Sequence, residues 1–191
     1  MQRVKNIDMF ELDKFALPKN FRGRNRLIVQ LWWLTQSTLF GMSPQVFYKW
    51  RVFLLRFFGA KIGDGVLVRP SARVTYPWKV SIGDNSWVGD DVTLYSLGEI
   101  SIGANSVISQ KTYLCTGSHD YNSKYFDIFS KPIFVGDSTW IASDVFVAPG
   151  VSIGDFVVVG ARSSVFKDIE SNLICRGSPA EVVGVRPANT N

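Results

Sequence analysis

Aliphatic residues recur at every sixth position over much of the chain. The longest run is Val135, Ile141, Val147, Ile153, Val159 and Val165. The same spacing occurs earlier in three groups of three, which are Ile62, Val68 and Val74, then Ile82, Val88 and Leu94, then Ile102, Ile108 and Leu114. Between these groups the spacing widens from six residues to eight, and we attribute both changes to two-residue insertions at turns.

A period of six matches neither the 3.6-residue repeat of a helix nor the alternation of a long strand. It is typical of a triangular solenoid, in which each hexad forms one short strand and a turn, and three hexads form one coil. The aliphatic residue would point inward, and the small residue after it, such as Gly136 or Gly154, would permit a tight corner. A β-sandwich would instead place turns at intervals of about 8–12 residues and would not explain the strict register. We therefore predict an all-β solenoid over residues 59–183.

The first 58 residues follow a different pattern. Residues 1–25 are polar and we expect them to be irregular, whereas residues 26–58 are rich in aromatic residues and predict two short helices. In the second helix, Ser43 is the expected N-cap, Pro44 the first helical residue and Gly59 the end.

Two roles are open for this helical segment. The helices would cap the end of the solenoid, because an uncovered terminal coil exposes a hydrophobic core and sheet edges. Lys49, Arg51 and Arg56 lie among the aromatic residues, so the helices would also suit contact with an anionic membrane surface.

The hexad register breaks between Leu114 and Val135, and the gap is not a multiple of six. We therefore expect residues 115–133 to leave the wall of the solenoid as a protruding loop. This loop contains "TGSHDYNS", in which His119 is the only histidine of the chain. Loops on rigid scaffolds often carry chemistry, and imidazole titrates near neutral pH. His119 is therefore a candidate catalytic base.

Other chemistries for this segment are disfavoured by composition and spacing. One histidine does not supply the several imidazole ligands of a zinc carbonic anhydrase site, so we expect no metal. Ser118 and Asp120 are sequence neighbours of the histidine, whereas hydrolase triads are assembled from distant positions.

Composition adds limits on location and partners. The chain has 191 residues, enough for one domain, and its net charge of +5 is compatible with a nucleic acid, a membrane surface or a phosphorylated cofactor. No basic run interleaved with aromatic residues indicates a nucleic-acid groove, so we expect no nucleic-acid partner. Cys115 and Cys175 have no metal spacing and are expected to be buried thiols in a reducing compartment.

The length of the apolar stretch and the N-terminal sequence favour a cytoplasmic protein. The apolar stretch from Leu27 to Leu34 is interrupted by Gln30 and is well short of the ~20 residues that span a bilayer. The N-terminal stretch "MQRVKNIDMFELDK" lacks the apolar segment and cleavage site of a secretory signal. A peripheral position at the inner membrane face stays open.

The motifs "IGDNSW", "IGANSV" and "VGDSTW" resemble those of the hexapeptide-repeat family, which folds as a left-handed parallel β-helix. Over residues 57–183, about two-thirds of the chain, the sequence is similar to the colanic acid biosynthesis type of acetyltransferase. The segments that carry this resemblance are "FFGAKIGDGV", "YLCTGSHDYNS", "FDIFSKPIFVGDSTWIAS", "VAPGVSIGD" and "GSPAEVV".

The resemblance implies an acetyl-CoA-dependent O-acetyltransferase that acts on a sugar hydroxyl in exopolysaccharide or surface-glycan biosynthesis, with His119 as general base. It also implies a homotrimer whose cofactor groove lies between neighbouring solenoids, and it is compatible with a lipid-linked acceptor. Two alternatives stay open, an N-acyltransferase acting on an amino-sugar nucleotide and a non-catalytic binding module.

Site residues are carried over from the resemblance by position. The cofactor would contact Trp140, Ala142, Ser143, Gly160, Ala161, Phe166, Lys167 and Pro179. The acceptor would contact Tyr95, Ser96, Asp120, Tyr125, Phe126 and Asp127. Asp120 is also a candidate to orient the imidazole, and residues 184–191 are expected to form a tail beyond the solenoid.

Overall fold

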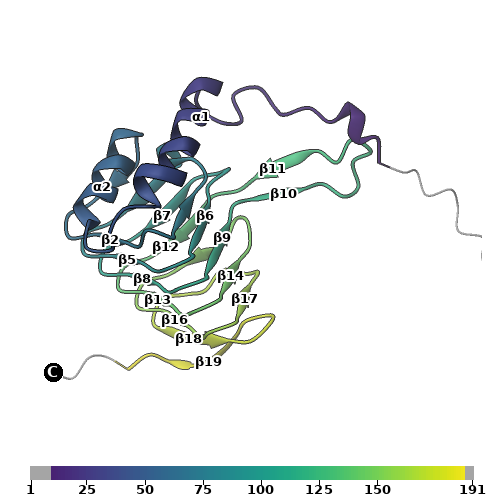
Figure 1. The fold of residues 1–191 in the computed structure, drawn as a ribbon. Coiled ribbons are helices and arrows are strands. Elements are labelled where there is room, and N and C mark those ends of the chain that lie inside the picture. Colours follow the sequence, from purple (N-terminus) through teal and green to yellow (C-terminus); the bar gives the residue numbers. More distant parts are fainter. Residues whose placement is uncertain (1–9, 188–191) are drawn as a thin grey trace, which may run out of the picture.

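The hexad strands stack into three parallel sheets that form the faces of a prism (Figure 1). The computed structural model describes residues 10–187. The first sheet contains β1 (Lys61–Ile62), β4 (Val80–Ile82), β7 (Ile100–Ile102), β12 (Ile133–Val135) and β15 (Ser152–Ile153). The second contains β2 (Leu67–Val68), β5 (Trp87–Val88), β8 (Val107–Ile108), β13 (Trp140–Ile141), β16 (Val158–Val159) and β18 (Leu173–Arg176). The third contains β3 (Arg73–Val74), β6 (Thr93–Tyr95), β9 (Tyr113–Cys115), β14 (Phe146–Val147) and β17 (Ser164–Val165).

The predicted six-residue ladder forms the core of this prism. Within each sheet the hexad aliphatic residues pair in register, as Ile82 does with Ile102 and Leu94 with Leu114, and all of them are buried. Burying one such side chain stabilises the fold by about 1.5–3 kcal/mol, so the three inward side chains of each coil make similar contributions. The solenoid prediction is therefore confirmed.

The corner glycines are required by crowding between coils. A Cβ on Gly83 would lie 2.6 Å from the backbone nitrogen of Ala104, and one on Gly103 would lie 2.6 Å from the carbonyl carbon of Gly136. The left-handed backbone occurs two residues later, at Asn85 with φ 58° and at the equivalent residues of other coils. Glycine therefore follows Ile82 and Ile102 because the next coil lies directly against the backbone at these corners.

Helices close the N-terminal end of the prism, as predicted. Helix α1 (Arg26–Thr35) begins at Asn25, whose side chain accepts a hydrogen bond from the Ile28 amide at 2.9 Å. It continues into a π-helical turn, η2 (Gln36–Phe40), and α2 (Tyr48–Phe57) follows. Trp32 is buried, and its indole N–H donates to the carbonyl of Val74 at 2.8 Å, which ties α1 to the first coil.

The predicted start of the second helix is wrong. Ser43 does not cap it, because its hydroxyl donates to the Phe40 carbonyl at 2.6 Å, and Pro44 lies in a turn. Helix α2 starts at Tyr48 instead, without a side-chain cap. The end is as expected, since Gly59 follows the helix with a φ of 98°.

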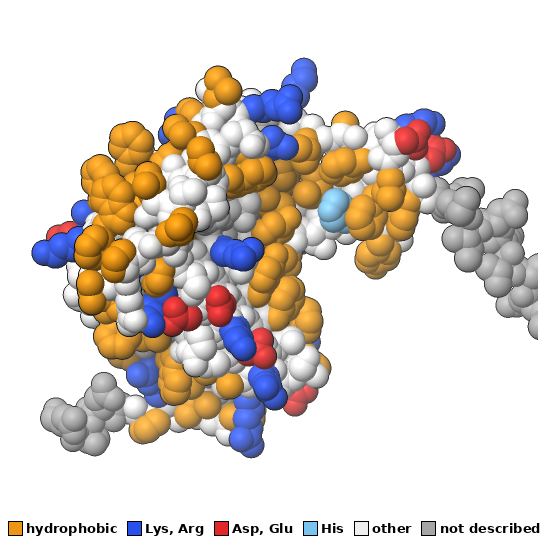
Figure 2. Space-filling view, in the orientation of Figure 1, with side chains coloured by type: hydrophobic (Ala, Val, Ile, Leu, Met, Phe, Trp, Pro, Cys, Tyr) orange, Lys and Arg blue, Asp and Glu red, His pale blue; other side chains and the backbone are white. Residues whose placement is uncertain are grey.

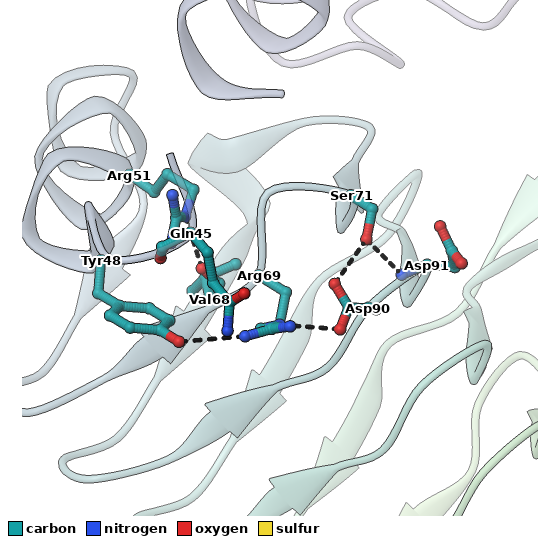
Figure 3. Close-up of polar contacts among 8 residues, drawn as sticks. All are labelled: Gln45, Tyr48, Arg51, Val68, Arg69, Ser71, Asp90 and Asp91. Carbon is teal, nitrogen blue, oxygen red and sulfur yellow. Dashed lines mark hydrogen bonds and ion pairs between the residues drawn. The ribbon is translucent and has the colours of Figure 1, made fainter. Parts of the chain in front are cut away.

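Arg51 anchors α2 to the first coil (Figure 3). It is fully buried, and its guanidinium donates to the carbonyls of Val68, Pro44 and Gln45 at 2.6, 2.9 and 2.5 Å and to the Ser43 hydroxyl at 2.8 Å. The expectation that Arg51 contributes to a membrane-facing surface is therefore wrong, because the side chain is fully buried and all three guanidinium nitrogens donate inside the protein.

A second polar group lies beside this anchor. The Arg69 guanidinium bonds the Asp90 carboxylate at 2.8 Å and the Tyr48 hydroxyl at 3.2 Å, and the Ser71 hydroxyl donates to the same carboxylate at 3.0 Å. These contacts join α2 to the first two coils.

Two short elements occupy the predicted insertions, and a third covers the far end of the prism. The 3-10 helix η3 (Pro77–Lys79) occupies the first insertion, and a bend after β6 occupies the second. At the C-terminal end, β19 (Glu181–Val185) pairs antiparallel with β18. The predicted tail at 184–191 therefore begins inside β19, and residues 188–191 lie outside the described residues.

Candidate active site

The predicted protruding loop is a β-hairpin that leaves the prism after β9 (Figure 1). Its strands are β10 (Gly117–His119) and β11 (Ile128–Ser130), which pair antiparallel with His119 opposite Ile128. Gly117 packs against Leu97 at the base, where a Cβ would lie 2.6 Å from a Leu97 methyl carbon. The hairpin projects from the side of the prism, and the space between the hairpin and the later coils is open to solvent (Figure 2).

The imidazole of His119 is held in one orientation and one tautomer. Its Nδ1 lies 2.7 Å from the carbonyl oxygen of Phe126. Because a carbonyl oxygen only accepts hydrogen bonds, Nδ1 carries the proton and Nε2 keeps its lone pair. The Phe126 ring also stacks on the imidazole, with centroids 4.1 Å apart and planes inclined by 9°. The arrangement is that of a half-buried, oriented base.

The orienting group is Phe126 and not Asp120. The Asp120 side chain accepts a hydrogen bond from the Asn122 amide at 2.9 Å, and the Asp120 amide donates to the Asp127 carbonyl at 2.8 Å. Asp120 therefore forms the hairpin turn, and the expectation that it orients the imidazole is corrected. The backbone of Phe126, at a φ of 54°, turns its carbonyl toward the histidine.

An N-terminal strap, residues 10–15, lies along the hairpin. The Glu11 amide donates to the Lys124 carbonyl at 2.9 Å, and the Glu11 carboxylate forms ion pairs with Lys14 and Lys124. Phe10 packs on Phe126 with ring centroids 5.0 Å apart, and Phe15 lies 6.0 Å from the imidazole. The part of the predicted irregular segment that the structure describes therefore contains a 3-10 helix, η1 (Leu12–Lys14), and the strap packs against the hairpin that carries His119.

The predicted acceptor residues divide into two groups. Tyr125 and Asp127 are exposed on the hairpin, and the Asp127 carboxylate accepts a hydrogen bond from the Ser123 hydroxyl at 2.6 Å. Tyr95 lies on the outer face of the third sheet, where burial raises the pKa of its phenol. Ser96 is different, because it is fully buried and its hydroxyl serves the backbone of Tyr76. Ser96 is therefore a structural residue of the insertion and is removed from the acceptor set.

Four aromatic rings form a ladder on the outer face of the third sheet, below the hairpin. Tyr95, Tyr113, Phe146 and Phe166 follow one another with centroid separations of 5.8, 6.1 and 5.9 Å. Tyr95, Tyr113 and Phe146 are half-buried, and Phe166 is exposed. Among the expected cofactor residues, Phe166 is the one that belongs to this ladder.

The other expected cofactor residues lie in the later coils. Ala142 and Ser143 form the corner between β13 and β14, and Gly160 and Ala161 form the same corner one coil further on. The two corners are joined by hydrogen bonds, including one from the Arg162 amide to the Ser143 carbonyl at 2.9 Å. Ala142 is buried, Ser143 and Gly160 are half-buried, and Ala161 is exposed.

Three more expected residues lie in the later coils. Trp140 is exposed on β13 and donates to the Ser109 hydroxyl at 2.9 Å, Lys167 is exposed after β17, and Pro179 is exposed between β18 and β19. A narrow edge of small residues, with an aromatic ring and a lysine nearby, fits a flexible thioester arm that ends in phosphates.

Three known proteins show what the chain is similar to. It is 62% identical over 178 residues to the colanic acid biosynthesis acetyltransferase WcaF of Escherichia coli (strain K12), with 93% of this chain and 98% of the relative covered. The crystal structure of a maltose O-acetyltransferase from Clostridium difficile 630 matches with a TM-score of 0.79 and 25% identity, covering 95% of this chain and all of that chain. A galactoside acetyltransferase in complex with coenzyme A also has a TM-score of 0.79, with 26% identity and coverage of 90% and 85%.

The chain belongs to the hexapeptide-repeat acetyltransferases of the colanic acid biosynthesis type. The left-handed parallel β-helix that the resemblance implied is therefore confirmed. No family model matches the sequence.

Sequence reasoning missed several features of this candidate site. The aromatic ladder had a signal, because Tyr113 and Phe146 directly precede inward aliphatic residues and so had to point outward. No sequence signal indicates that Phe126 orients the imidazole, since this role depends on a backbone carbonyl. No signal indicates the strap either, because Phe10 and Phe15 lie in a polar segment without periodicity.

The two cysteines of this acetyltransferase have different positions. Cys175 is buried in the core as expected, whereas Cys115 points to the outer face of β9 and is half-buried. Burial raises the pKa of both thiols, so neither is activated as a nucleophile.

Proposed function

We propose that the protein is an acetyl-CoA-dependent O-acetyltransferase that modifies a sugar hydroxyl in exopolysaccharide or surface-glycan biosynthesis, with His119 as its general base. The observation that carries the proposal is the hydrogen bond from Nδ1 of His119 to the Phe126 carbonyl, which leaves Nε2 as a free acceptor. The similarity to an acetyltransferase along almost the whole chain supports the reaction class.

The proton transfer follows from this geometry. Acetyl-CoA, when bound, supplies an acetyl group activated as a thioester. Nε2 of His119 takes the proton of the acceptor hydroxyl as its oxygen attacks the acetyl carbonyl. The Phe126 carbonyl stabilises the imidazolium that results, because it already accepts a hydrogen bond from Nδ1–H. The same imidazolium then returns the proton to the departing sulfur, so an ester and a thiol form.

The binding residues are proposed by position. Trp140, Ala142, Ser143, Gly160, Ala161, Phe166, Lys167 and Pro179 would hold the cofactor, with Lys167 toward its phosphates. Tyr95, Tyr125 and Asp127 would contact the sugar, and Asp120 and Phe126 would shape the hairpin around it.

We further propose a homotrimer in which the hairpin of one subunit reaches the cofactor edge of the next. Two features support it. The hairpin projects away from its own prism, whereas the cofactor edge lies in the later coils (Figure 1). The ladder also leaves aromatic surface on the third sheet that a neighbouring subunit would cover. A cytoplasmic enzyme at the inner membrane face, acting on a lipid-linked glycan, would be consistent with this arrangement.

The test is the activity of His119→Ala, followed as thiol release from acetyl-CoA in the presence of glycan acceptors. Turnover should fall by roughly 10²–10⁴, the usual contribution of a positioned base, while the variant stays folded. Tyr121→Ala is the matched control, because Tyr121 lies on the same hairpin and is largely exposed. Unchanged turnover in His119→Ala would refute the proposed role of the imidazole.

The acceptor panel distinguishes the alternatives. Sugars that offer only hydroxyl groups and amino sugars are supplied in parallel as acceptors. We expect transfer of the acetyl group to a hydroxyl oxygen, and transfer to the amine alone would indicate an N-acyltransferase. Absence of thiol release with every acceptor would favour a non-catalytic binding module. Crystals soaked with coenzyme A should place the sulfur within reach of Nε2 of a neighbouring subunit.

A further inference from the structure

The helical cap has apolar residues on both of its faces. The inner face of α1 and α2 packs on the first coil. The outer face carries two apolar stripes, Leu27, Leu31 and Leu34 on α1, and Trp50, Phe53 and Phe57 on α2, and we call these six residues the cap face. Leu27 is 81% exposed and Phe57 is 72% exposed. Hydrophobic side chains gather over both helices in the space-filling view (Figure 2).

Helical spacing makes each stripe continuous. Both sets follow steps of three or four residues, which places them along one side of a helix. On α2 the rings also contact one another, since Trp50 and Phe53 stack at 5.7 Å and Phe53 and Phe57 lie 6.2 Å apart. Single exposed apolar residues need no explanation, but contiguous ones at this spacing indicate a surface that is covered in use.

The sequence around the cap face is rich in basic residues, although Arg51 is buried and Asp64 lies exposed beside Arg56. Residues 14–63 contain nine Lys and Arg residues and no Asp or Glu. The rest of the chain therefore carries 21 − 9 = 12 basic and all 16 acidic residues, a net charge of −4. Lys49 and Arg56 are two turns apart and so lie along the same side of the aromatic stripe of α2, and Arg56 is paired with Asp64 at 3.0 Å, just beyond the segment. A basic rim beside an apolar stripe complements an anionic bilayer surface.

A hollow beside α2 extends the cap face. It has a volume of about 730 Å³ and is lined on one side by Trp50 and Phe53 and on the other by Val66 and Leu67. Lys49, Arg56 and Asp64 also line this hollow, and Asp64 is paired with Arg56. The apolar walls would accept an acyl chain, and Lys49 would then meet an anionic headgroup.

We propose that the cap face docks on the surface of a bilayer containing anionic lipids. Between residues 10 and 187, no helix has the length and apolar character that crossing a membrane requires, so the contact is interfacial. Two copies of the chain are a poorer occupant, because docking cap face to cap face would bring two basic rims together.

Docking would also orient the candidate active site. The hairpin leaves the prism near the end that carries the helices, and the last coils lie at the opposite end (Figure 1). The cap face on lipid would therefore hold His119 near the membrane, where a lipid-linked glycan presents its hydroxyls. Only this last point rests on the proposed function, since the docking itself follows from the apolar stripes and the charge.

Vesicle co-sedimentation of the full chain tests the proposal without acetyl-CoA. Vesicles of phosphatidylcholine alone are compared with vesicles that also contain phosphatidylglycerol. The wild type should bind the anionic vesicles more tightly, and added salt should weaken that binding. Leu31→Glu and Phe53→Glu should each lower the partition coefficient by at least about ten-fold, because one apolar contact is lost and a negative charge is added.

Val185→Glu is the matched control, because Val185 is an aliphatic residue at the far end of the prism that is at least as exposed as Leu31 and Phe53, and its substitution should leave binding unchanged. Far-UV circular dichroism checks that each variant is folded. Failure of the folded wild type to bind either vesicle would overturn the proposal, as would equal loss in the Val185 control. The oligomeric state is measured by sedimentation velocity without lipid. A change of oligomeric state in Phe53→Glu would show that the cap face is an interface between subunits and would also overturn the proposal. Each of these results leaves the acetyltransferase assay of His119→Ala unaffected.

Discussion

Removing the Phe126 ring should slow acetyl transfer without weakening cofactor binding. The ring stacks on the His119 imidazole at 4.1 Å and 9°, and its own backbone carbonyl accepts the Nδ1 proton. In Phe126→Ala the carbonyl stays but the stacking surface is lost. A stacked aromatic pair is worth about 0.5–1.5 kcal/mol, so the productive orientation of the imidazole should become roughly two- to thirteen-fold less populated. The loss should appear in kcat, with the KM for acetyl-CoA unchanged.

The assay is steady-state thiol release at saturating acceptor, with acetyl-CoA varied. Phe126→Tyr retains the ring face and should keep kcat close to the wild-type value. Tyr121→Ala removes an aromatic ring of the same hairpin that is largely exposed, and should have no effect. If Phe126→Ala retained full kcat, or if Tyr121→Ala lost as much, the stacked ring would not be what positions the base.

Two further predictions concern the cap and the strap. Arg51→Met should lower the free energy of unfolding by about 3–5 kcal/mol in denaturant titrations, since one buried and three part-buried acceptors lose their charged donor, and unchanged stability would contradict the anchoring role. The ion pairs with Lys124 and Lys14 lower the pKa of Glu11 below its ordinary value of 4.5. The contribution of Glu11 to holding the strap is therefore present above that value and lost as the pH falls through the lowered pKa. The exchange protection of the Glu11 amide should fall over that range, and in Glu11→Gln it should already be low at neutral pH.

The fold could be predicted from the sequence because its signal is local and repeated. One aliphatic residue in every six points inward, and a small residue often follows it. The same arrangement is needed in every coil, so its repetition makes the pattern unambiguous. The protruding segment was equally readable, since a break in a strict register has to leave the wall. His119 followed from this break together with the presence of one histidine in the chain.

Details of the cap and the site were less accessible. Ser43 and Pro44 form a sequence pattern typical of a helix start, but a tertiary contact overrides it, because Ser43 is needed by the Arg51 guanidinium and the turn continues to Tyr48. Arg51 looked like one basic residue among several, and only packing against the first coil shows that its charge is turned inward. Ser96 looked available to a ligand until the insertion placed its hydroxyl on the Tyr76 backbone.

The sequence alone thus determined the prism, the hairpin position and the identity of the candidate base. The tertiary structure decided which nitrogen of that base is free, because this depends on a carbonyl seven residues away whose direction is set by the left-handed backbone at Phe126. It also decided which basic and aromatic residues of the cap face outward. Periodicity reports which side of an element is apolar, but α1 and α2 are apolar on two sides, and only contact with the first coil distinguishes the buried side from the exposed one.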